Sequence, residues 1–212
     1  MAVERFGASQ VTSVGFRYNQ RHAAEMDAAA SIARHLGVDR VIIDVPHLPG
    51  WDDSSLLHHA LPIGGGGPIP NSFVASRNGL FLMMASPLAR KVGAKHIYIG
   101  VMEKEGANSG YPDCSRQYID LVQAVIRADL QDPEVVVETP LCSLSKAETL
   151  AIAHKAAILE FLLRTTVTCY EGTPLLGCTH CPACQLRNEG IVTFYREHPE
   201  LSVPWPFSRL LV

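Results

Sequence analysis

The sequence lacks several features that would assign it to common classes of protein. Its 212 residues contain no run of about 20 apolar residues, so no membrane span is predicted. The opening residues MAVERFGASQ have no apolar core, and we expect no secretory signal peptide. The net charge of −3 offers no basic field for a nucleic-acid backbone. Six cysteines without such a signal favour a reducing cytoplasm, where thiols stay free.

Apolar residues are abundant, at 47% of the chain, and predict one domain, or one domain with a small appendage. Short apolar runs at 11–16, 38–46, 95–101 and 134–141 read as strands. Helices are predicted over 20–37, 77–92, 115–130 and 145–156. This alternation predicts an α/β fold with a parallel sheet. Ligands of such sheets bind beyond the carboxyl ends of the strands. The polar segments that follow the strands should therefore meet at one rim.

Some local sequence patterns predict specific structural features. Ser145 and Glu148 form the pattern of a capping box. Pro87 should break or kink the helix over 77–92. Residues 46–72 read as a long loop, of the kind that is a lid, a binding loop or disorder. A short helix is expected after Cys184.

The strongest motif is a cysteine cluster near the end of the chain. Cys169, Cys178, Cys181 and Cys184 follow the spacing C-x8-C-x2-C-x2-C. Two-residue spacers let a tight turn bring two sulfurs onto one ion, and four thiolates leave no position for water. The spacing therefore predicts a structural Zn²⁺ site rather than a catalytic one. A disulfide cluster and plain buried thiols are the alternatives, and His180 is a weaker candidate ligand.

Polar residues at the expected rim are the next candidates. Arg77 and Asn78 open an apolar helix, a place that attracts anions, although a solvated first turn is the alternative. Asp113 lies in the turn SGYPDC, where it either serves a site or caps the next helix. Lys146 opposes the helix dipole unless it faces a phosphate or carboxylate.

The remaining polar candidates are individually weak. Tyr18, Arg21 and His22 begin a helix and need no function to explain them. The long loop holds a scattered group of metal-ligating types that reads more simply as solvated, namely Asp52, Asp53, His58 and His59.

Five segments together resemble the 7-cyano-7-deazaguanine synthases, the queuosine-pathway enzymes that make the preQ0 nitrile. In order they are FRYNQRHAAEMDAA (16–29), IPNSFVASRNGLFL (69–82), SGYPDCSRQYID (109–120), TPLCSLSKAETLA (139–151) and TCYEGTPLLGCTHCPACQLRNEG (168–190). The resemblance implies a PP-loop, Rossmann-like α/β domain of the nucleotide α-hydrolase type over 1–165. It also implies a zinc-binding C-terminal segment over 166–212.

The implied reaction is ligation of ammonia to 7-carboxy-7-deazaguanine, driven by ATP with Mg²⁺, in a homodimer that contacts neither nucleic acid nor membrane. On matched positions, the cysteines would hold zinc, and Lys146 and Arg77 would serve catalysis. The positions implied for substrate or nucleotide binding are Tyr18, Gln20, Arg21, His22, Asn78, Gly100, Ser109, Gly110, Tyr111 and Asp113.

The chain also departs from the family pattern. It contains no SGGxDS phosphate loop, and Arg17 and Asn19 stand where the family has aspartate and glycine. We therefore expect weak ATP binding, and a gap in the sheet where a first strand and helix are missing. Three interpretations follow: a fragment of an active synthase, a non-catalytic deazaguanine-binding or scaffold protein, or a defence-associated relative.

Overall fold

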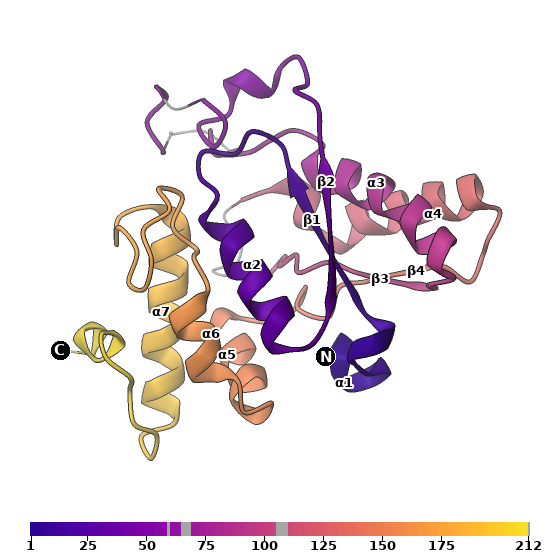
Figure 1. Ribbon diagram of the computed structural model, residues 1–212. Coiled ribbons are helices and arrows are strands. Elements are labelled where there is room, and N and C mark those ends of the chain that lie inside the picture. Colours follow the sequence, from indigo (N-terminus) through magenta and orange to yellow (C-terminus); the bar gives the residue numbers. More distant parts are fainter. Residues whose placement is uncertain (59, 65–68, 105–109, 212) are drawn as a thin grey trace.

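The computed structural model describes residues 1–58, 60–64, 69–104 and 110–211 (Figure 1). The strands are β1 (Thr12–Arg17), β2 (Asp39–Asp44), β3 (His96–Tyr98) and β4 (Val136–Glu138). The helices are α1 (Ala2–Phe6), α2 (Ala24–His35), α3 (Arg77–Val92), α4 (Arg116–Leu130), α5 (Lys146–Lys155), α6 (Leu159–Thr165) and α7 (Pro182–Glu197). Short 3₁₀ turns span Ala8–Gln10, Trp51–Asp53, Pro112–Cys114 and Phe207–Leu210.

The predicted α/β class and the parallel pairing of strands are confirmed. Strand β1 pairs with β2, and β3 pairs with β4, both in parallel. Among the described residues the strands form two separate two-stranded sheets. Helix α2 contacts the β1–β2 pair, and the ring of Phe16 in β1 stacks on Phe81 of α3 at 4.2 Å. Ile119 and Ile126 of α4 are fully buried against the β3–β4 pair.

The opening residues form helix α1, which sequence reasoning did not predict. Phe6 packs its ring 5.2 Å from that of His96, and Arg5 donates hydrogen bonds to Tyr98 Oη and Glu138 Oε1. Helix α1 therefore covers one face of the β3–β4 pair.

Three helix predictions need correction: the start of α2, the break expected at Pro87, and the short helix expected after Cys184, which is the 16-residue α7 and begins at Pro182. Helix α2 begins at Ala24 rather than Gln20, because Gln20 uses its side chain in the preceding turn: its Oε1 accepts from Tyr18 N and its Nε2 donates to Phe16 O. Helix α3 runs through Pro87 without a break. Proline cannot donate to the carbonyl four residues earlier, and Ser86 Oγ donates to that carbonyl of Met83 at 3.0 Å instead.

The described parts of the 46–72 loop are packed against the fold. Trp51 is 4% exposed and donates from Nε1 to Ala75 O at 3.0 Å. Leu57 joins it in a cluster with Tyr18, Val45 and Val74. The loop is therefore a structured wall beside the end of β1.

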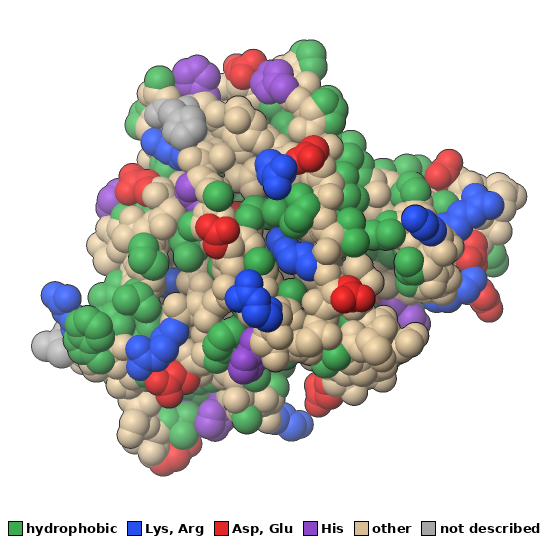
Figure 2. All heavy atoms as spheres, in the orientation of Figure 1, with side chains coloured by type: hydrophobic (Ala, Val, Ile, Leu, Met, Phe, Trp, Pro, Cys, Tyr) green, Lys and Arg blue, Asp and Glu red, His purple; other side chains and the backbone are tan. Residues whose placement is uncertain are grey.

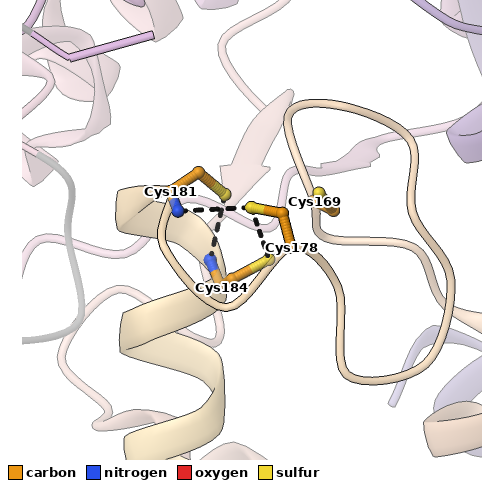
Figure 3. Close-up of side chains that lie close together, drawn as sticks. All are labelled: Cys169, Cys178, Cys181 and Cys184. Carbon is orange, nitrogen blue, oxygen red and sulfur yellow. Dashed lines mark hydrogen bonds between the residues drawn. The ribbon is translucent and has the colours of Figure 1, made fainter.

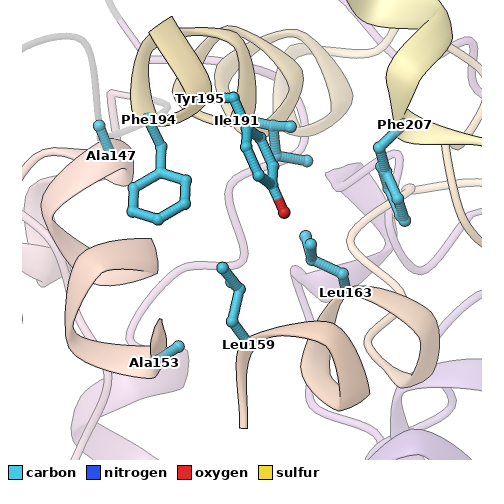
Figure 4. Packing of buried hydrophobic residues seen from close by; sticks show 8 residues of the cluster. All are labelled: Ala147, Ala153, Leu159, Leu163, Ile191, Phe194, Tyr195 and Phe207. Carbon is cyan, nitrogen blue, oxygen red and sulfur yellow. The ribbon is translucent and has the colours of Figure 1, made fainter. Parts of the chain in front are cut away.

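Helices α5, α6 and α7 share the largest apolar cluster (Figure 4). Phe194, Ile191 and Phe207 are fully buried within it. The capping box is confirmed, since Ser145 Oγ accepts from Glu148 N and Ser145 N donates to Glu148 Oε2. Helices α5 and α6 were not assigned to the C-terminal segment, yet they pack on α7; the boundary at 165/166 stays a prediction.

No helix of the described part of the chain is both long and apolar enough to span a bilayer. On the face in Figure 2, acidic and basic side chains are interspersed rather than gathered by sign. That face offers no continuous basic surface.

Candidate metal centre and substrate pocket

The four predicted cysteines converge on one point. Their Sγ atoms all lie within 4.8 Å of one another, and Cys178 Sγ is 4.0 Å from Cys184 Sγ. Tetrahedral Zn–S bonds of about 2.3 Å place sulfurs about 3.8 Å apart, so the cluster fits one zinc ion. Figure 3 shows Cys169 approaching from its own loop while the other three surround the start of α7. All six cysteines are free, which excludes the disulfide alternative.

Backbone groups around the cluster favour thiolates. Glu171 N points at Cys169 Sγ at 3.4 Å, Cys181 N at Cys178 Sγ at 3.3 Å, and Cys184 N at Cys181 Sγ at 3.4 Å. Burial acts to raise the pKa of Cys169, but backbone N–H donors, that of Glu171 foremost, outweigh it and lower the value to about 6. Burial raises the pKa of Cys178 and Cys184 instead. The four converging sulfurs, rather than the pKa values, are what suit a soft divalent cation.

The other metal candidates are weaker. Glu171, Cys178 and His180 form a second, largely exposed group, so His180 sits beside the cluster. Asp52 pairs with His47 at 3.2 Å. The described residues of the long loop supply no further metal-ligating group, and His59 lies outside the described residues.

Gly177 gives a direct test of this geometry. Its φ is 70°, and a Cβ added there would collide with Cys184 Sγ. We expect Gly177→Ala to reduce zinc content and to destabilise the fold by about 2–4 kcal/mol. The matched control is Gly93→Ala at the end of α3, where φ is 72° and no atom lies within 4 Å. Melting temperature and zinc per chain measure both variants, and equal losses in the two would contradict the collision.

A cavity of about 340 Å³ opens beside the cysteine cluster, at the end of β1. This volume falls in the range of small-molecule sites, about 300–1,000 Å³. Its lining includes the predicted catalytic residue Arg77 and six of the predicted binding positions, namely Tyr18, Gln20, Arg21, His22, Asn78 and Tyr111. Sequence reasoning missed the remaining lining residues, which are Phe16, Glu25, Met26, Leu56, Phe81 and Tyr170.

Arg77 is the central cation of this pocket. Its guanidinium lies 6.0 Å from the ring of Tyr111 and interacts electrostatically with Tyr18 and Asp113. Burial acts to lower the pKa of Arg77, but these neighbours raise it further, so the charge is retained. An accessible fixed charge among aromatic rings suits a planar anionic ligand.

Asp113 supports the pocket from behind. It is 2% exposed, its Oδ2 accepts from Asn78 N at 3.2 Å, and its carbonyl accepts from Asn78 Nδ2 at 3.4 Å. Burial raises the pKa of the Asp113 carboxyl. The alternative in which Asp113 caps the next helix is wrong, because Ser115 is the N-cap of α4 and accepts from Tyr118 N.

The cysteine module supplies one wall of the pocket. Tyr170, next to Cys169, shares a 2.8 Å hydroxyl contact with Tyr111, whose hydroxyl also donates to Ser72 Oγ. His22 Nε2 lies 3.0 Å from the carbonyl of Cys169 and must donate to it, because a carbonyl only accepts. His22 Nδ1 is buried without a partner among the described residues. The metal centre and the pocket are therefore physically joined.

Arg21 has a second role besides lining the pocket, and the other predicted positions lie elsewhere. Arg21 Nη1 donates to the carbonyls of Ser55 and Leu61, which anchors the long loop. Gly100 and Gly110 lie outside the lining, and Ser109 lies outside the described residues.

Lys146 also lies outside the lining of the pocket. Its Nζ is 2.9 Å from Met102 Sδ, and burial lowers its pKa. Helix α7 fixes its position, because a Cβ on Gly190 would collide with Lys146. Lys146 also interacts electrostatically with Cys114, the residue that follows Asp113 in the sequence.

The model of the family described as "Queuosine biosynthesis protein QueC" matches residues 1–195. The match includes all four cysteines and every lining residue of the pocket.

Proposed function

Because the chain belongs to the QueC family of queuosine biosynthesis proteins, we propose that it binds 7-carboxy-7-deazaguanine in the pocket at the end of β1. The bound base would be converted with ammonia and ATP to 7-cyano-7-deazaguanine. The observation that most supports this proposal is which segments of the sequence supply the residues that line the pocket. All of the described lining residues except Leu56 come from four of the five resembling segments, which lie far apart in the sequence.

The pocket suits the chemistry of that substrate. A carboxylate resists attack by ammonia because its leaving group would be oxide. Adenylylation of the carboxylate by ATP would release pyrophosphate, and attack of ammonia on the acyl adenylate would release AMP and give the amide. A second ATP would adenylylate the amide oxygen with release of pyrophosphate, and that oxygen would leave with AMP as the nitrogen loses its protons and the nitrile forms. Arg77 would pair with the substrate carboxylate, and the Phe16 and Phe81 rings would stack on the base. Tyr111 and Tyr170, joined to each other through their hydroxyls, would form the wall of the pocket on the side of the cysteine cluster.

Zinc would act in this protein as a structural ion. Cys169, Cys178, Cys181 and Cys184 would hold it, and four thiolates leave no open coordination position. Bound zinc would fix the turn that carries Tyr170 and the carbonyl that orients His22. ATP with Mg²⁺ would be the co-substrate, and Lys146 is the cation that we assign to its phosphates.

A binding protein without turnover is the second candidate. The sequence has no SGGxDS segment, and the described strands form two small sheets rather than one. A scaffold or defence-associated role belongs to this candidate. Homodimerisation stays a prediction, which sedimentation velocity would test.

Two measurements on the full chain distinguish the candidates. Calorimetric titration with 7-carboxy-7-deazaguanine should show one site per chain, and guanine at the same concentration should bind more weakly because it lacks the carboxylate. With ammonia and ATP added, an active ligase releases pyrophosphate or AMP in step with the nitrile. Binding without release would favour the second candidate, and no binding would refute both.

A further inference from the structure

Among the described residues that line the pocket, Glu25 is the one whose charge is opposite to that of Arg77. It stands in the first turn of α2, one helical turn after His22, and its side chain is exposed into the cavity. Its carboxylate forms no hydrogen bond or ion pair with the described residues. His22 and Arg77 attract it electrostatically. The surrounding walls desolvate the carboxyl and raise its pKa. The lining thus contains one carboxylate without a hydrogen-bond partner among the described residues and, on a different element, the guanidinium of Arg77.

This pair of charges matches the two ends of a carboxylated guanine-type base. One edge of the base carries two hydrogen-bond donors, the ring N1–H and the exocyclic amine. The carboxylate projects from the five-membered ring, away from that edge. A glutamate accepts two parallel hydrogen bonds from such a donor pair, and an arginine donates two to a carboxylate. The stacked rings of Phe16 and Phe81 offer an apolar surface for the bicycle.

We propose that Glu25 is the specificity-determining residue that reads the N1–H and exocyclic amine of the bound base, opposite Arg77; this rests on the proposed function. Gln20 Oε1 already accepts from Tyr18 N, and His22 Nδ1, which has no partner within the described part of the chain, can accept only one hydrogen bond. Among the described lining residues, Glu25 supplies the carboxylate that can accept two parallel hydrogen bonds. Glu25 therefore separates 2-amino bases from bases that lack the amine.

A helix-dipole role does not account for this placement. Asp27 also stands in the first turn of α2, where an acid is favourable, yet it lies outside the cavity lining. An ammonium-binding role for Glu25 makes a different kinetic prediction, since it would change the dependence on ammonia rather than on the base.

The test is a binding cycle with two ligands and three proteins. The ligands are 7-carboxy-7-deazaguanine and its analogue without the exocyclic amine, 7-carboxy-7-deazahypoxanthine. The proteins are the natural chain, Glu25→Gln and the control Asp27→Asn. The natural chain and the control should prefer the 2-amino base by about 10- to 100-fold, the effect of one charge-assisted hydrogen bond. In Glu25→Gln, affinity for the 2-amino base should fall at least about tenfold and the preference should shrink toward one.

The possible results separate the role of Glu25 from the proposed function. An unchanged preference in Glu25→Gln overturns the role of Glu25 and leaves the proposed function standing. Absence of binding of either ligand to the natural chain overturns both. For a chain with turnover, a raised KM for ammonia with an unchanged KM for the base would assign Glu25 to ammonium and also refute the proposal. Equal melting temperatures of Glu25→Gln and Asp27→Asn are expected, because neither carboxylate has a partner among the described residues that its loss would orphan.

Discussion

Replacing Cys181 with serine is expected to remove the bound zinc and most of the stability of the C-terminal part. Cys181 is 2% exposed, belongs to the four-sulfur cluster, and accepts from Cys184 N as the N-cap of α7. Structural zinc contributes about 10–16 kcal/mol of binding free energy in small zinc-finger peptides, much of it folding free energy. Loss of one ligand should therefore lower the free energy of unfolding by at least about 3 kcal/mol.

The matched control is Cys142→Ser. Cys142 is also buried, at 7% exposure, but its Sγ contacts Glu103 Oε2 and the carbonyl of Cys114 rather than the cluster. A serine there retains a donor, so zinc content should stay at one per chain. Elemental analysis and denaturant unfolding measure both variants. A natural chain that carries no metal, or a Cys181→Ser chain as stable as Cys142→Ser, would rule out a structural ion.

The same substitution should also weaken the pocket. Tyr170 follows Cys169 directly, and the Cys169 carbonyl orients His22. If the zinc-bearing turn loosens, two lining side chains lose their support. Affinity for 7-carboxy-7-deazaguanine should then fall even in conditions where the Cys181→Ser chain is still folded.

Sequence reasoning succeeded where one local pattern determines the structure. The two-residue spacers of the cysteines permit few backbone paths, so convergence of the sulfurs followed from spacing alone. The capping box depends on Ser145 and Glu148 within one turn of helix. Parallel pairing followed from the alternation of strands and helices.

It failed where a side-chain contact that no sequence pattern marks determines the structure. Nothing in the sequence around Pro87 shows that Ser86 bonds the carbonyl that proline leaves without a donor. Tyr170 was passed over because only the neighbouring cysteines carry a motif, although its hydroxyl meets Tyr111 across 59 positions. Glu25 lies within one of the segments that resemble the family. Its position three residues after His22 was the sequence signal that could have identified it as a pocket residue.

The departures from the family pattern have structural explanations. Asn19 adopts φ 61°, in the left-handed region that glycine populates freely and asparagine tolerates better than most residues. It therefore preserves the turn after β1. Arg17 instead forms an exposed ion pair with Asp44 of β2 at 2.8 Å, outside the pocket lining. Neither substitution alters the walls of the cavity.

Replacing Arg77 with methionine should abolish recognition of the substrate carboxylate. Truncating one partner of a buried charge pair costs about 2–5 kcal/mol, so affinity for 7-carboxy-7-deazaguanine should fall by about 100-fold or more. Arg77→Lys keeps the charge but loses the planar pair of donors, and an intermediate loss of about tenfold is expected. Loss of the guanidinium also removes an attraction that lowers the pKa of Asp113, so that carboxyl should titrate at still higher pH in Arg77→Met.

The ligand without the carboxylate separates recognition from a general collapse of the site. Unsubstituted 7-deazaguanine should bind the natural chain weakly and Arg77→Met about equally well, since its recognition does not use the guanidinium. Arg90→Met, in the exposed last turn of the same helix, is the control for losing one positive charge. It should leave both affinities unchanged. Parallel losses for the two ligands in Arg77→Met would mean that the arginine supports the shape of the pocket rather than pairing with the carboxylate. The position of Arg77 between Tyr18, Tyr111 and Asp113 makes that the alternative that the experiment must exclude.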